Sequence, residues 1–110
     1  MIGGISLIED ILKSEYSFKF DDLRKNRMAT SYYKYGPIKN NYGEKLINAI
    51  ENLEIRLKKY KETGNTEYLL DVANFAMIEF MYPQHKNPYF KATDSQDKLQ
   101  GMTIKELENL

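Results

Sequence analysis

Apolar side chains recur at helical spacing through the middle of the chain. Steps of four, three, four and three residues place one row of them along a single helix face: Leu46, Ile50, Leu53, Leu57 and Tyr60. Such a row is typical of a helix that packs lengthwise on a partner. We expect this helix to run from about Tyr42 to Lys61, with Asn41 as its N-cap.

A second helix is expected after a very short connection. The segment Thr63-Gly64-Asn65 suits a helix end, because its glycine tolerates the left-handed C′ conformation. Either Asn65 or Thr66 can cap the second helix, which is apolar over a wide face and reaches about Met81. Helices joined so tightly are antiparallel neighbours. The pattern therefore predicts an antiparallel helical hairpin over residues 41–83.

Shorter helices are expected on both sides of this hairpin. Ser6-Leu-Ile-Glu9 and Thr103-Ile-Lys-Glu106 are capping-box patterns, which open helices. Asp21 and Asp22 suit the positive start of a further helix that reaches about Thr30. We expect the N-terminal helices to pack against the hairpin.

Two segments lack helical periodicity. The tyrosine-rich run 32–35 is followed by Gly36-Pro37 and is compatible with a short strand. Residues 84–101 are expected to be irregular, poorly ordered or docked on a partner. The sequence thus predicts an all-α single domain, with N-terminal helices over 1–40, the hairpin, and a tail over 84–110 that ends in a short helix.

Composition narrows the class of protein without indicating its chemistry. The chain has 110 residues, of which 42% are hydrophobic and 29% charged, a balance typical of one globular domain. Its formal net charge is zero, so no overall field attracts nucleic acid or an anionic membrane. The absence of cysteine excludes disulfides and thiolate metal sites. No apolar run suits a membrane span and the start lacks a basic signal-peptide region, so a cytoplasmic location is expected.

Acidic side chains on the hairpin have the spacing of metal ligands. Glu51 and Glu54 lie on the first helix, and Glu67, Asp71 and Asn74 lie on the second. Spacings of three and four residues place each set on one helix face. Carboxylate and amide oxygens suit a hard cation such as Mg²⁺. A magnesium site between the two helices is therefore one prediction.

Ordinary ion pairs are the alternative explanation of the same acids. Glu54 and Lys58 form a favourable i,i+4 pair, and Lys58 is also level with Asp71 across the hairpin. Glu67 lies in a first turn, where an acid complements the helix dipole. Asn74 is harder to explain, because it is a poor helix former within an apolar stretch and needs hydrogen-bond partners if buried.

A basic segment rich in tyrosine precedes the hairpin. Between Leu23 and Gly43 there are five cations and no acid, with tyrosines interleaved. Cations hold phosphates and aromatic rings stack on bases, so these residues could bind a nucleotide. The candidates are Arg24, Lys25, Arg27, Lys34, Tyr33 and Tyr35. The alternative is a helix end with cations near its negative pole, followed by tyrosines whose rings pack while their hydroxyls stay hydrated.

The acidic pattern resembles that of the all-α, MazG-like nucleoside triphosphate pyrophosphatases over roughly Asn41 to Pro83. Glu51 and Glu54 would match the first acidic pair of that superfamily, and Asp71 the final acid. The resemblance implies Mg²⁺ bound between helices, hydrolysis of nucleotides to monophosphate and pyrophosphate, and dimers or tetramers. The chain departs from the pattern at Tyr68, where an acid is usual. It also resembles small proteins of Firmicute phages and prophages.

Two functions are therefore expected. The first is a Mg²⁺-dependent nucleotide-binding protein, which the resemblance extends to a nucleoside triphosphate pyrophosphohydrolase. The alternative is a non-enzymatic phage protein that sequesters a nucleotide signal or that binds and inhibits a host defence protein. Ile55, opposite the apolar row, indicates a homo-oligomer. The lone histidine, His85, is expected to be a surface residue.

Overall fold

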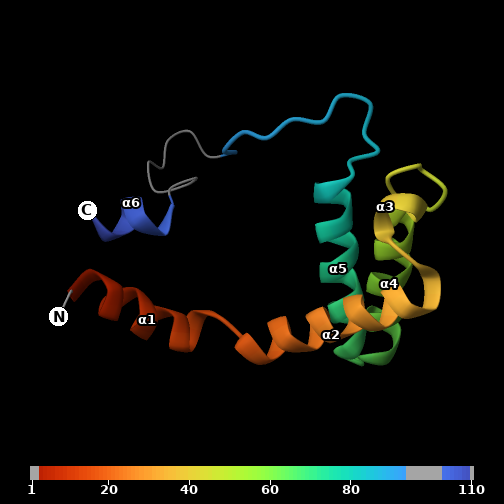
Figure 1. The fold of residues 1–110 in the computed structure, drawn as a ribbon. Coiled ribbons are helices and arrows are strands. Elements are labelled where there is room, and N and C mark those ends of the chain that lie inside the picture. The colour runs from red at the N-terminus through yellow and green to blue at the C-terminus, as the bar shows by residue number, and fades with distance from the viewer. Residues whose placement is uncertain (1–2, 94–102, 110) are drawn as a thin grey trace. The chain divides into compact units, whose positions relative to one another are not determined.

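A computed structural model, which describes residues 3–93 and 103–109, shows an entirely helical chain (Figure 1). Six helices and no strand occur in these residues, which confirms the all-α prediction. The chain divides into two compact units, Met1–Ser17 with Tyr89–Leu110, and Phe18–Pro88. Each unit is described by itself.

The predicted helical hairpin is confirmed in the Phe18–Pro88 unit. Helices α4 (Ala49–Thr63) and α5 (Glu67–Met81) lie antiparallel and side by side (Figure 1). Gly64 ends α4 in the left-handed conformation, with φ of 74°, and its N–H donates to the Tyr60 carbonyl at 2.7 Å. The Asn65 side chain accepts a hydrogen bond from the Glu67 N–H at 3.0 Å, which satisfies one free donor at the start of α5.

The hairpin begins later in the chain than the apolar pattern predicts. Helix α4 starts at Ala49, and Asn48 rather than Asn41 is its N-cap. The Asn41 carbonyl instead accepts two N–H groups of the loop that follows, at 2.9 Å each. Lys45 in this loop has φ of 58°, which no helix can contain. Leu46 is therefore outside the helix and is 71% exposed, contrary to its predicted place in the apolar row.

Helix α2 (Phe18–Tyr35) packs across α5 near the turn that joins α5 to α4 (Figure 1). Its predicted end at Thr30 is wrong, because the tyrosine-rich run continues the helix instead of forming a strand. Gly36, with φ of 82°, ends it by donating its N–H to the Tyr32 carbonyl at 2.9 Å. The short helix α3 (Ile38–Asn41) follows.

The other unit contains α1 (Gly3–Glu15) and α6 (Ile104–Glu108), which pack on each other. Helix α1 begins before Ser6, so the capping box predicted there does not open it. The capping box at Thr103 is confirmed, because its hydroxyl accepts the Glu106 N–H at 3.1 Å. Residues 84–93 are irregular, as predicted, and the rest of that predicted segment lies outside the described residues.

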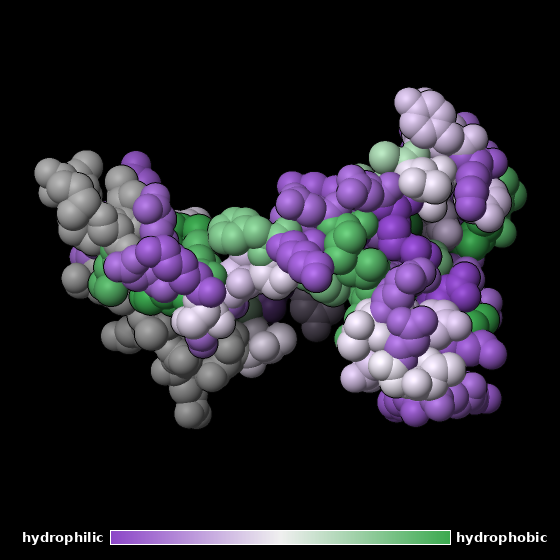
Figure 2. Space-filling model, turned by 90° about the horizontal axis from the view of Figure 1, so that it is seen from below, coloured by the Kyte–Doolittle hydropathy of each residue, from purple (hydrophilic) through white to green (hydrophobic). Residues whose placement is uncertain are grey.

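Few apolar side chains are fully buried in the described residues. Ala49, Leu70 and Ile78 are buried, and all three lie on the hairpin. Many larger apolar side chains stay partly exposed, and Figure 2 shows hydrophobic residues reaching the surface beside polar ones. Within the described residues, no helix combines the length and the apolar character needed to cross a membrane.

The turn of the hairpin offers a direct test of this fold. A Cβ added at Gly64 would meet no atom within 4 Å, so the Gly64→Ala substitution changes only the backbone preference. We expect it to lower the free energy of unfolding by about 1 kcal/mol, measured by urea denaturation. Gly64→Asn is the control and should cost less, because asparagine tolerates the left-handed region. Equal losses from both substitutions would contradict this account of the turn.

Candidate functional site

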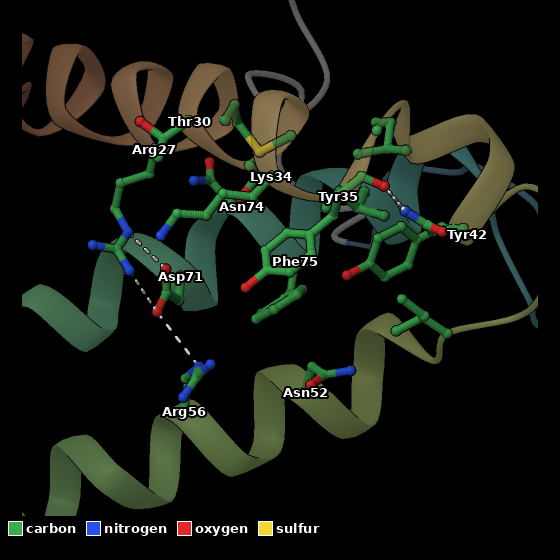
Figure 3. A pocket seen from close by; sticks show the side chains of 17 residues that line it. Arg27, Thr30, Lys34, Tyr35, Tyr42, Asn52, Arg56, Asp71, Asn74 and Phe75 are labelled. Carbon is green, nitrogen blue, oxygen red and sulfur yellow. Dashed lines mark hydrogen bonds and ion pairs between the residues drawn. The ribbon is translucent and has the colours of Figure 1, made fainter.

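Asp71 on α5 is the centre of a cluster of ion pairs that joins three helices (Figure 3). Arg27 of α2 donates from Nε to Oδ1 at 2.9 Å and from Nη2 to Oδ2 at 3.3 Å. Arg56 of α4 places its Nε 3.4 Å from Oδ2. Arg27 also reaches Glu67, with Nη1 2.9 Å from Oε1. The Asp71 side chain is 18% exposed, and guanidinium groups contact both of its oxygens.

The acids predicted as metal ligands are not gathered in one place. No group of three His, Cys, Asp or Glu side chains that could hold a metal ion occurs within residues 3–93 and 103–109. Asp71 and Glu67 bind Arg27, whereas Glu51 and Glu54 are exposed on α4. The arginine pairs explain Asp71 and Glu67 without a metal. A magnesium site at these residues stays a prediction that this arrangement does not favour.

The predicted ion pair between Lys58 and Asp71 is made by Arg56 instead. Arg56 precedes Gly64 by eight residues and Asp71 follows it by seven, so the two are nearly level across the hairpin. Lys58 is similarly close in height but is rotated by about 200° around α4 relative to Arg56. The distance of Arg56 from the turn at Gly64, together with its angular position around α4, could have identified it from the sequence as the partner of Asp71. The role of Arg27 depends on where α2 packs.

The residues predicted to bind nucleotide fall into two groups. Arg24 and Lys25 pair with Asp21 on their own helix, at 2.7 and 3.5 Å. Tyr33 is 89% exposed and contacts Tyr32 edge to face. The other three candidates lie around one cavity: Arg27, Lys34 and Tyr35.

This cavity has a volume of about 450 Å³ and lies among α2, α3, α4 and α5. Its size is within the range of small-molecule sites. Its charged lining consists of three cations and one acid: Arg27, Lys34, Arg56 and Asp71. Three aromatic rings also line it: Tyr35, Tyr42 and Phe75. Figure 3 shows the rings on the side of the cavity away from the Arg27–Asp71–Arg56 cluster.

Asn74 lies in the cavity wall on α5 and is buried, with 5% of its surface exposed. Its Nδ2 donates to the backbone carbonyl of Arg24 at 3.0 Å and so ties α5 to α2. Its Oδ1 is buried and has no hydrogen-bond partner among the described residues. An unsatisfied buried acceptor costs about 1–3 kcal/mol. The expectation that a buried Asn74 needs partners is thus met for the amide nitrogen only.

The nucleotide ligands predicted from the sequence did not include several residues that line the cavity, among them Arg56, Asn52, Tyr42 and Phe75. Asn52 and Arg56 are four residues apart on α4 and share a helix face, which was a readable signal. Burial raises the pKa of the Tyr42 hydroxyl above its ordinary value of 10. Comparisons of the chain with protein-family models, curated proteins and solved structures found no match.

The ion-pair cluster predicts different roles for two charged residues of the hairpin. Asp71→Ala leaves two arginines without their shared carboxylate and should lower the free energy of unfolding by about 1–2 kcal/mol. Lys58→Ala is the control and should change it by less than about 0.5 kcal/mol, because Lys58 is exposed. Urea denaturation of both variants measures the difference. A larger loss for Lys58→Ala would restore the predicted Lys58–Asp71 pair.

Proposed function

We propose that the Phe18–Pro88 unit binds a nucleotide in the cavity among α2, α3, α4 and α5. One observation supports this proposal above all, namely that cations and aromatic rings line the same cavity of about 450 Å³. A nucleotide combines anionic phosphates with a flat aromatic base, and it therefore needs both kinds of side chain.

The three cations of the cavity differ in the donors that they can offer. Arg27 uses three nitrogens on Asp71 and Glu67, so it chiefly holds the helices together. Arg56 faces Asp71 with Nε, and no hydrogen bond of its Nη groups is found in the described part of the chain. Lys34, unlike Arg56, has no ion pair within the described residues. Arg56 and Lys34 are therefore the proposed phosphate ligands.

The aromatic side of the cavity suits the base. Tyr35 and Tyr42 approach from α2 and the segment after α3, and Phe75 approaches from α5 (Figure 3). Stacking of a base on an aromatic ring contributes about 1–3 kcal/mol and tolerates different bases. The Tyr42 phenol is neutral at physiological pH, as an ordinary tyrosine is, so its ring adds no negative charge beside a phosphate-bearing ligand.

Binding alone requires less of the site than hydrolysis does. The pyrophosphohydrolase prediction assigns Mg²⁺ to acids, of which Asp71 and Glu67 already bind Arg27. The cavity therefore favours the non-enzymatic alternative, in which the protein sequesters a nucleotide.

Titration calorimetry with the four ribonucleoside triphosphates and their monophosphates tests the proposal, in Mg²⁺ and in EDTA. We expect binding of at least one nucleotide in either buffer. Arg56→Ala and Lys34→Ala should each raise its Kd about tenfold or more, because each removes a charge-assisted contact to phosphate.

Lys59→Ala is the matched control, because Lys59 is an exposed cation of α4 outside the cavity. Its Kd should equal that of the unmodified chain. Absence of binding to every nucleotide, or an equal loss in Lys59→Ala, would refute the proposed site. Release of pyrophosphate in the Mg²⁺ samples would support the pyrophosphohydrolase prediction instead.

A second candidate function is self-association, favoured by apolar side chains left exposed on α4. Ile55 is 53% exposed and Ile50 is 39% exposed. Covering such surface with a second copy contributes roughly 25 cal/mol per Å² of apolar area removed from water. The alternative expected from the sequence, that the protein binds and inhibits a host protein, stays a prediction.

Light scattering after size exclusion measures this association. We expect a mass above the 12.9 kDa of one chain, and a return to 12.9 kDa in Ile55→Lys. Lys59→Glu changes a neighbouring exposed charge and should keep the larger mass. A monomeric unmodified chain would rule out the second copy.

A further inference from the structure

We infer that the cavity takes a nucleotide with a single phosphoryl group, a nucleoside monophosphate, in preference to a di- or triphosphate. This inference rests on the proposed function and names the class of nucleotide. The observation behind it is the amount of positive charge in the cavity wall. Three cations and one acid form the charged lining, so its formal charge is +2.

Part of this positive charge is already offset within the protein. Arg27 places Nε and Nη2 on Asp71, at 2.9 and 3.3 Å, and Nη1 on Glu67 at 2.9 Å. All three nitrogens of this guanidinium group therefore contact carboxylates. Glu67 lies outside the lining and its side chain is 61% exposed, so solvent screens its charge. Counting Glu67 in full lowers the formal charge from +2 to +1, so a ligand meets between one and two positive charges.

The cations are gathered at one side of the cavity. Arg56 lies beside Asp71, with its Nε 3.4 Å from Oδ2. Lys34 is seven residues after Arg27 on α2, but long side chains of a helix slant toward its N-terminus. Figure 3 shows Lys34 directed back toward Arg27 and Asp71, and it shows the aromatic rings on the other side. The proposed phosphate ligands, Arg56 and Lys34, thus mark one place for phosphate rather than a row of places.

A single phosphoryl group matches this amount of charge. A phosphate monoester carries about −1.5 to −2 at neutral pH, close to the charge that the cavity can neutralise. Each further phosphoryl group adds negative charge, for which the lining has no further cation among the described residues. The added charge would also lie near Asp71, whose carboxylate repels it. A longer phosphate chain should therefore bind more weakly than a single phosphate.

Calorimetry with a series of phosphorylated ligands tests this inference on the unmodified chain. The series is one nucleoside with its mono-, di- and triphosphate, in EDTA and at constant ionic strength, with the base of the best-bound nucleotide of the panel. We expect the monophosphate to bind most tightly. The nucleoside should bind about tenfold more weakly, because it lacks the charge-assisted contacts. The triphosphate should bind about fivefold more weakly than the monophosphate, because part of its charge is not neutralised.

The variant Asn52→Lys adds one cation to the lining, because Asn52 is an uncharged residue of the cavity wall on α4. It should lower the ratio of the triphosphate Kd to the monophosphate Kd about threefold or more. Asn26→Lys is the matched control, since it makes the same change at an exposed position of α2 outside the cavity. The control should leave the ratio unchanged. If Asn52→Lys loses its helical circular dichroism, the ligand series on the unmodified chain decides the question alone.

Each outcome separates the inference from the proposed function. A triphosphate that binds the unmodified chain as tightly as the monophosphate, or more tightly, overturns the inference while the nucleotide site stands. A nucleoside that binds as tightly as its monophosphate also overturns it, because the cations then contribute nothing. Equal Kd ratios in folded Asn52→Lys and Asn26→Lys variants overturn the charge argument in the same way. Absence of binding by every ligand refutes the proposed function and the inference together.

Discussion

The carboxylate of Asp71 is the contact on which the arrangement of the Phe18–Pro88 unit depends. It lies on α5 and binds one guanidinium from α2 and another from α4, so three helices meet at one side chain. Only three apolar side chains of the described residues are buried, and none of them lies on α2. Polar contacts therefore contribute much to the position of α2 on the hairpin. They include the hydrogen bond from Asn74 to the Arg24 carbonyl.

The same interaction gives the cavity its character. Asp71 offsets part of the positive charge of the lining, whose other charged residues are Arg27, Lys34 and Arg56. Single ion pairs at partly exposed sites contribute little to stability, whereas Arg27 binds both oxygens of Asp71 through two nitrogens, which fixes its geometry more closely. The charged lining of the cavity, three cations and one acid, therefore keeps a net positive charge.

Local signals along the chain predicted much of the fold, and their failures have physical causes. Gly64 and Thr103 end and begin helices as expected, because each acts through backbone groups only a few residues away. The start of α4 was misplaced because Asn41 and Asn48 are both good caps, and the loop that contains Lys45 selects the later one. Strand preference in the tyrosine-rich run was outweighed by continuation of α2 up to Gly36.

By itself the sequence determined the helical class, the hairpin and its turn, because periodicity and caps act over a few residues. It also identified Asn74 as a polar residue in an apolar stretch, and Arg56 was within reach of the same reasoning. Only the tertiary structure decided that Arg27, 44 residues from Asp71 in the chain, supplies its partner. Because α2 packs on the hairpin, Asp71 and Glu67, which have the spacing of metal ligands, bind Arg27 instead. No local sequence pattern specifies which distant cation pairs with them.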